Sequence, residues 1–273
     1  MSQETEEKNS CRLPEIYHRG ERGRAILLLH GFNTEVSRTD IIFKYFAGKG
    51  FTVARPILPG HSGSEHDREI LRGAGPDQWL GAAQSWLEHL EKETDRIFVI
   101  GISFGGNLAA ALAPKSRKIA GLVFWEMPIF FTPRMWFVIN ILQPTLGPLL
   151  GLAGIDFIRK NPLIYRRRYG RERRSQSTFN FIPIRAVGKI RKFIRERTMP
   201  GLKDITAPVY ILHAAKSDLL DNRRTARYIY EHIGSSEKKI YQVPIENHDL
   251  NILDDEGKTI TLEKVFHFIE GIG

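Results

Sequence analysis

Cysteine is almost absent from this sequence, and its first residues lack any apolar run. The single cysteine, Cys11, cannot form an intramolecular disulfide, and we assign it no role. The first 15 residues are polar and acidic, without the apolar core that follows a basic start in a secretory signal. We therefore expect a cytoplasmic protein.

Patterns that bind metals or phosphates are also missing. No pair of histidines or cysteines has metal-ligand spacing in a suitable element, and no glycine-rich phosphate-binding loop occurs. We expect neither a metal nor a cofactor. The 273 residues hold no internal repeat or low-complexity linker, and 42% of them are hydrophobic, which suits a single α/β domain.

Acidic residues are scarce in one part of the chain. Residues 128–200 contain 15 Lys/Arg and three Asp/Glu, whereas the remainder contains 25 Lys/Arg and 28 Asp/Glu. The net charge of +9 therefore belongs to this one segment. The asymmetry bears on partners and not on the fold.

Elsewhere, short apolar runs alternate with longer amphipathic ones, which predicts a mostly parallel sheet flanked by helices. Near-continuous hydrophobicity, as in AILLLH and IFVIGI, is typical of strands buried on both faces. We predict strands over 25–30, 51–56, 97–102, 119–125, 208–213 and 239–244, and helices over 39–49, 78–93, 107–113, 223–233 and 262–269.

Residues 128–200 interrupt this alternation and contain no good strand. We predict that they form an inserted helical cap, or lid, and that residues 15–127 and 201–273 form the core. The uncharged stretch 135–155 is long enough to span a bilayer. Prolines and a glycine interrupt its centre, so we interpret it as a lid over an apolar pocket.

The third predicted strand runs into Gly101-Ile102-Ser103-Phe104-Gly105, and a helical pattern follows. In this context, G-x-S-x-G places the serine on a tight strand-to-helix turn with its hydroxyl above the sheet. The N-terminus of the helix favours negative charge nearby. We predict that Ser103 is a nucleophile.

A serine hydroxyl needs a base to take its proton, and the base needs a carboxylate to fix its tautomer. Of nine histidines, only His248 lies in a loop between the last predicted strand and the closing helix, where the order Ser, Asp, His puts the base. Asp218, just beyond the strand 208–213, is the predicted carboxylate. Asp221 is its competitor, because that residue equally suits the cap of the next helix.

Acyl transfer also needs two backbone N–H groups that face the developing oxyanion. We predict the N–H of Phe104, the residue after the nucleophile, and that of Phe32, in the loop after the first strand. Gly31 allows the backbone to turn there.

With these motifs placed, the sequence resembles the α/β-hydrolase superfamily, and within it the bacterial carboxylesterase and monoacylglycerol-lipase group. The matching text is LLLHGF at 27–32, RPILPGHSGS at 55–64, PDQWLGAAQSWLEHL at 76–90, IGISFGGNLA at 100–109, APVYILHAAKSD at 207–218 and NHDLNILDDE at 247–256. The resemblance implies an α/β-hydrolase fold, the same triad and oxyanion hole, and esters of medium acyl chain. Trp125 and Met127 stand where the group commonly has small residues, and we expect them to contact substrate and shorten the pocket.

These features predict a serine hydrolase that cleaves carboxylic esters through an acyl-enzyme. The same triad also serves thioesters, lactones and carbon–carbon bonds, and a non-enzymatic alternative is binding of a membrane or partner. The basic cluster at 166–174 suits either a solvated helical face or contact with anionic lipid. Nucleic acid is not expected, since no recognised fold or stacking platform accompanies the arginines.

Overall fold

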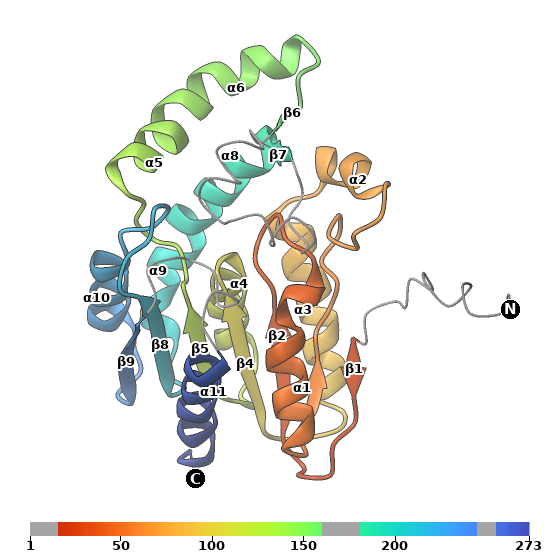
Figure 1. Ribbon diagram of the computed structural model, residues 1–273, viewed down its shortest axis with the longest axis vertical. Coiled ribbons are helices and arrows are strands. Elements are labelled where there is room, and N and C mark those ends of the chain that lie inside the picture. The colour runs from red at the N-terminus through yellow and green to blue at the C-terminus, as the bar shows by residue number, and fades with distance from the viewer. Residues whose placement is uncertain (1–15, 160–180, 245–254, 273) are drawn as a thin grey trace, which may run out of the picture.

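A seven-stranded sheet forms the centre of the molecule (Figure 1). The computed structural model describes residues 16–159, 181–244 and 255–272. The strand order is β1-β3-β2-β4-β5-β8-β9; β1 pairs antiparallel with β3, and the other neighbours pair in parallel. The strands are β1 (Tyr17–His18), β2 (Ala25–Leu29), β3 (Thr52–Ala54), β4 (Ile97–Ile102), β5 (Ile119–Trp125), β8 (Val209–Ala214) and β9 (Lys238–Val243).

Helices cover both faces of this sheet. The helices of the core are α1 (Asp40–Gly48), α2 (Asp67–Gly73), α3 (Pro76–Leu90), α4 (Phe104–Leu112), α10 (Asn222–His232) and α11 (Asp255–Glu270). Alternate side chains of β2 enter two separate clusters: Leu27 belongs to the cluster that includes residues of α3, α4 and α10, whereas Ile26 belongs to the cluster that includes residues of α1 and α11. All five residues of β2 are buried, as a strand covered on both faces requires.

The predicted architecture is confirmed. The predictions for 97–102 and 119–125 match β4 and β5 to the residue, and the other predicted strands lie within a few residues of β2, β3, β8 and β9. The two-residue edge strand β1 and the short helix α2 are absent from the prediction, because neither is long enough to show a period.

The segment 128–200 leaves the sheet after β5, and its described residues 133–159 and 181–183 lie beyond the carboxyl ends of the strands (Figure 1). Its described parts contain α5 (Pro133–Phe137), a π-helical turn (Val138–Leu142), α6 (Gln143–Leu152), β6 (Phe157–Arg159), β7 (Phe181–Pro183), α8 (Ile184–Phe193) and a second π-helical turn (Ile194–Thr198). We refer to the continuous helix Pro133–Leu152 as the cap helix.

The expectation that this segment lacks strands is wrong. Strands β6 and β7 pair antiparallel, with Ile158 opposite Ile182. Aromatic side chains in contact across the strands stabilise such a short pair. Phe157 and Phe181 are diagonal neighbours in the register, and their rings lie 5.1 Å apart in an edge-on arrangement. Sequence periodicity cannot reveal two strands of three residues each.

Candidate active site

Ser103 occupies a strained turn between β4 and α4. Its φ is +52°, a left-handed conformation that is unusual for a residue with a side chain. Its backbone N–H donates to the carbonyl oxygen of Trp125 at 2.8 Å, and its own carbonyl accepts from Gly106 at 2.9 Å. The sharp turn that G-x-S-x-G predicts is thus present, held by the neighbouring strand and the first turn of the helix.

The flanking glycines permit this turn because the backbones come too close for side chains. A Cβ atom added at Gly101 would lie 2.4 Å from the carbonyl oxygen of Gly105. One added at Gly105 would lie 2.2 Å from the carbonyl oxygen of Leu29, at the end of β2. Helix α4 therefore approaches both its own strand and the next one at a distance that only glycine allows.

The loop after β2 lies directly beside Ser103. A Cβ added at Gly31 would lie 3.0 Å from the Cβ of Ser103 and 3.6 Å from its Oγ. The predicted oxyanion donors Phe32 and Phe104 follow Gly31 and Ser103, respectively, so they flank this contact. Their assignment as donors stays a prediction.

Two buried histidines hold this loop in place. His61 accepts a hydrogen bond at Nε2 from the backbone N–H of Asn33 at 3.0 Å and donates at Nδ1 to the carbonyl of Pro59. His30 accepts at Nε2 from the N–H of Leu58 at 3.2 Å. The two rings lie 5.2 Å apart. The loop after β2 is thus joined to the loop at 58–61 by imidazoles that must be neutral to accept.

Electrostatics keep both rings neutral. Burial, with a smaller contribution from the neighbouring His61, lowers the pKa of His30 to about 3. Burial likewise lowers the pKa of His61 to about 4. Sequence reasoning gave neither histidine a role, although each stands beside a glycine in a matching stretch, HG at 30–31 and GH at 60–61.

Asp218 lies in the loop between β8 and α10, on the same edge of the sheet as Ser103. The loop is attached to the inserted segment, since the hydroxyl of Thr132 donates to the carbonyl of Asp218 at 3.1 Å. The competitor, Asp221, accepts a hydrogen bond at Oδ1 from the N–H of Arg224 and caps α10. This capping role favours Asp218 as the carboxylate of the triad.

His248 lies outside the described residues, so its place in the triad stays a prediction. The elements on either side are described. Strand β9 ends at Val243, whose carbonyl accepts from the N–H of Ala215 at 3.2 Å. Strand β9 therefore ends beside β8, at the edge of the sheet where the loop with Asp218 begins.

Trp125 and Met127 are both only 2% exposed. Trp125 belongs to the core cluster of α1 and α11, and Met127 to the cluster on the opposite face. Met127 also packs on α4, since a Cβ added at Gly106 would lie 2.8 Å from its Cβ. The structure thus places both in the core, and their predicted contact with substrate stays a prediction.

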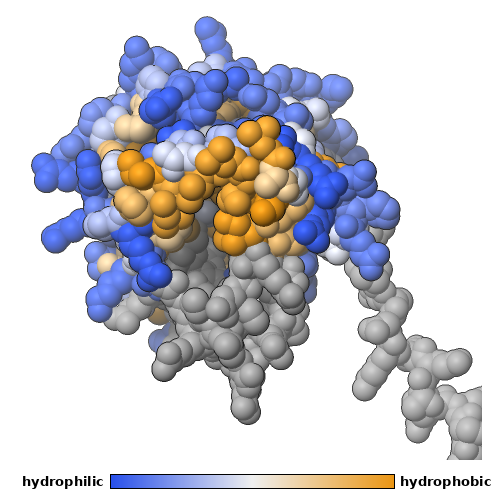
Figure 2. Space-filling model, turned by 90° about the horizontal axis from the view of Figure 1, so that it is seen from above, coloured by the Kyte–Doolittle hydropathy of each residue, from blue (hydrophilic) through white to orange (hydrophobic). Residues whose placement is uncertain are grey.

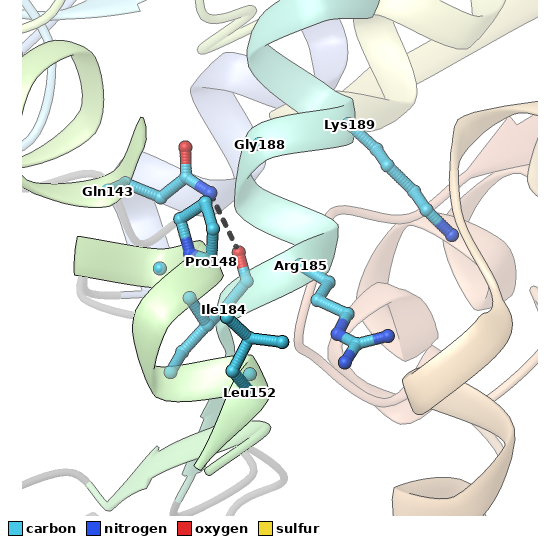
Figure 3. A pocket seen from close by; sticks show the side chains of 9 residues that line it. Gln143, Pro148, Leu152, Ile184, Arg185, Gly188 and Lys189 are labelled. Atoms are coloured by element: carbon cyan, nitrogen blue, oxygen red, sulfur yellow. Dashed lines mark hydrogen bonds between the residues drawn. The ribbon is translucent and has the colours of Figure 1, made fainter. Parts of the chain in front are cut away.

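A groove of about 450 Å³ opens between α6 and α8 (Figure 3). Gln143 crosses one end of it and donates from Nε2 to the carbonyl of Ile184 at 3.4 Å. Leu152 lies on the α6 side, and the cations Arg185 and Lys189 project from α8 (Figure 3). None of the described residues of the predicted site lines this groove. Among the described residues, no group of three His, Cys, Asp or Glu is placed to hold a metal ion.

Comparisons with known proteins identify the family of this chain and similar proteins. The family model described as serine aminopeptidase, S33 (Hydrolase_4) matches residues 20–254. The thermostable monoacylglycerol lipase of Bacillus sp. (strain H-257) is 33% identical over 98 residues, which span 36% of this chain and 38% of that protein. The carboxylesterase of Bacillus subtilis (strain 168) is 22% identical over 256 residues, 90% of this chain and 92% of that protein.

Among solved structures, one from work on the metagenome-derived lipolytic enzymes LipS and LipT is similar, with a TM-score of 0.74 and 20% identity. The match covers 93% of this chain and 96% of that chain. It confirms the predicted α/β-hydrolase fold.

Proposed function

Since the chain belongs to the serine aminopeptidase S33 family, we propose that it is a carboxylic ester hydrolase that acts through Ser103, Asp218 and His248. The observation that carries the proposal is the left-handed Ser103 at the end of β4, with the Gly31 loop against it. The relatives named lipase and carboxylesterase support ester hydrolysis as the reaction.

The chemistry is acyl transfer in two steps. His248 takes the proton of Ser103 as Oγ attacks the ester carbonyl, and the N–H groups of Phe32 and Phe104 stabilise the oxyanion. The alcohol departs with the proton from His248, and the acyl group remains bound to Oγ of Ser103. Water, activated by the same histidine, then releases the acid. Asp218 holds the imidazole in the tautomer that accepts from serine.

We assign short- to medium-chain esters or monoacylglycerols as the substrate class. The names of the two Bacillus relatives support this choice. The cap helix supports the view that the substrate comes from lipid. It is uncharged from Met135 to Leu152, and only 11% of its most apolar stretch is buried. Hydrophobic side chains gather on the face of the molecule that Figure 2 shows. The exposed apolar residues of the cap helix are Trp136, Phe137, Val138, Ile141, Leu142, Leu146, Leu149 and Leu152.

A place on the lipid surface suits this helix better than a transmembrane span, although it has the length and composition to cross a bilayer. Both of its flanks are attached to one body. The N–H of Thr132 donates to the carbonyl of Leu219 at 3.1 Å. Beyond its other end, the hairpin β6–β7 is joined to the core where the amide of Asn33 donates to the carbonyl of Phe181 at 2.9 Å.

Charge selects the kind of surface. The inserted segment has 15 Lys/Arg and three Asp/Glu, so a second copy of the chain docked on the same face would bring two strongly positive segments together. An anionic bilayer offers both an apolar interior and negative charge. We therefore assign anionic lipid as the surface that this segment contacts. The basic cluster at 166–174 lies outside the described residues.

Labelling with a fluorophosphonate tests the nucleophile. We expect one adduct per chain, which mass spectrometry locates on Ser103. Ser103→Ala should take no label, whereas Ser85→Ala, at an exposed serine of α3, should be labelled like the wild type. An adduct on another residue, or equal labelling of a folded Ser103→Ala, would reject the proposal.

A further inference from the structure

Glu126 is a buried acid at the edge of the sheet to which the mechanism gives no task. It directly follows β5 and is 2% exposed. Its φ is +55°, a second left-handed residue beside Ser103, and its N–H donates to the carbonyl of Leu212 at 2.9 Å. A left-handed backbone and a buried acidic side chain are both costly, so the partners of Glu126 show what it does.

The carboxylate of Glu126 binds the end of β8 and the start of α10 together. Oε1 accepts a hydrogen bond from the backbone N–H of Ala214, the last residue of β8. Both oxygens lie 3.3 Å from Nδ2 of Asn222, the first residue of α10. The same Nδ2 donates to the carbonyl of Ala214 at 3.0 Å. Asn222 is itself 6% exposed.

Ala214 and Asn222 are the two ends of one loop, residues 215–221, and Asp218 lies near its middle. The side chain of Asp218 is exposed, so burial does not fix the loop there. The anchors at both ends converge on Glu126. Through Trp125, the residue before it, the same point is joined to Ser103, whose N–H donates to the carbonyl of Trp125.

We infer that Glu126 is a positioning residue for the carboxylate of the triad: with Asn222 it clamps both ends of the loop that carries Asp218 and fixes that loop relative to Ser103. The inference rests on the proposed function. Glu126 acts through the loop and touches no reacting atom in this assignment. An extended residue at position 126 would continue the direction of β5. The left-handed backbone of Glu126 instead turns the chain and brings its side chain to the end of β8.

Two substitutions test the clamp from its two sides. Glu126→Gln turns an amide nitrogen toward the donors of Ala214 and Asn222, and Asn222→Ala removes the link to α10. We expect each to lower kcat about 10- to 100-fold with KM changed less than threefold, because a displaced Asp218 impairs proton transfer rather than ester binding. Glu69→Gln, at an exposed position in α2, is the matched control and should keep the wild-type kcat.

A double variant separates a shared clamp from two unrelated effects. If both residues hold one loop, Glu126→Gln with Asn222→Ala lowers kcat no further than the worse single change. Multiplied effects, or kcat within twofold of the wild type in both folded single variants, would overturn the inference. Asn222→Ala alone decides the matter if Glu126→Gln does not fold.

The rate of fluorophosphonate labelling distinguishes this inference from the proposed function, because it needs no substrate. A wild type that is not labelled at Ser103 would refute the proposed function itself. A labelled wild type with labelling at least tenfold slower in Asn222→Ala supports the clamp. Equal labelling rates in wild type and variant leave the proposed function standing and refute the clamp.

Discussion

Two regions depart from the usual pattern of apolar side chains inside and polar ones outside: the edge of the sheet at the carboxyl ends of the strands, around Ser103, and the cap helix. At the edge, polar side chains are buried: His30, His61 and Glu126 are at most 2% exposed. On the helix, apolar side chains are exposed, with Leu149 at 61% and Leu152 at 86%. Burial of polar groups and exposure of apolar groups both cost free energy, so each departure indicates a function of its region.

The buried polar groups have partners within the protein. His30 and His61 accept from backbone N–H groups, and Glu126 accepts from Ala214 and Asn222. Hydrogen bonds of this kind offset the cost of burial and fix the loops around Ser103. A cluster of large exposed apolar side chains instead indicates a surface that binds something outside the molecule. The edge of the sheet has the fixed geometry that catalysis requires, whereas the cap helix offers an apolar surface for contact with another molecule or a membrane.

The sharpest test of the edge compares its two candidate carboxylates. Asp218→Asn should lower kcat by about 10³-fold or more, because the base loses the group that fixes its tautomer. Asp221→Asn, at the cap of α10, should leave kcat within twofold and change the free energy of unfolding by no more than about 1 kcal/mol. Steady-state kinetics and urea unfolding measure the pair. The reverse ranking of kcat would move the catalytic role to Asp221.

Crowding of the nucleophile gives the next largest effect. Gly31→Ala puts a Cβ at 3.0 Å from the Cβ of Ser103, and a displacement of the oxyanion loop should lower kcat about 100-fold. Gly81→Ala is the matched control, since a Cβ in that exposed helical position meets nothing within 4 Å. It should keep activity and stabilise α3 by about 0.5 to 1 kcal/mol. Full activity in Gly31→Ala would separate this loop from the chemistry.

The buried histidines predict a loss of stability in acid. Their pKa values of about 3 and about 4 lie below the value of about 6.5 in the unfolded chain. Between about pH 6.5 and pH 4 the unfolded state therefore binds more protons than the native state, so stability falls as the pH falls. The two groups together contribute a slope of about 2.7 kcal/mol per pH unit near pH 5.

His61→Gln isolates half of this slope. The glutamine carbonyl takes the place of Nε2 as acceptor for the N–H of Asn33 but does not titrate. We expect the contribution to the slope near pH 5 to decrease by about 1.4 kcal/mol per pH unit, measured by urea unfolding across the pH range. His66→Gln, at an exposed position, should leave the slope unchanged. An unaltered slope in His61→Gln would show that this ring is protonated in the native state.

The smallest expected effect concerns the cap helix. Leu149→Gln with Leu152→Gln should weaken binding to vesicles of anionic and zwitterionic lipid several-fold, since apolar area no longer enters the interface. Turnover of a soluble ester should stay within twofold. Ile240→Gln, at a 43% exposed position of β9, should change neither. Unchanged vesicle binding of the double variant would refute the lipid contact, and a change of oligomeric state instead would assign the helix to a second copy.

The edge of the sheet was far easier to predict from sequence than the helix beyond it. Buried strands such as IFVIGI can be predicted because every residue in the run is apolar or glycine. The motif G-x-S-x-G predicts a turn because only glycine allows the close backbone contacts at Gly101 and Gly105. The contacts of Glu126 cannot be predicted from local sequence patterns, because its partners Ala214 and Asn222 are 88 and 96 residues away along the chain. A charged residue directly after a fully apolar strand was the available sign.

For the cap helix, the sequence predicted a helical segment but not its surroundings. Apolar residues from Met135 onward indicate either a buried face or an exposed one, and the choice depends on tertiary contacts that no period encodes. The predicted contact of Trp125 and Met127 with substrate likewise comes from their position in the sequence. Both are core residues, one in each of the two core clusters, and their contact with substrate stays a prediction.

The central claim, a serine hydrolase that cleaves carboxylic esters at Ser103, is tested most directly by hydrolysis of p-nitrophenyl esters from acetyl to palmitoyl. Wild type and Ser103→Ala are compared side by side, with folding of both checked by circular dichroism. We predict turnover by the wild type with an optimum at short to medium chains, and a loss of about 10³-fold or more in Ser103→Ala. Undiminished turnover by folded Ser103→Ala would contradict the account, as would a folded wild type that cleaves no ester.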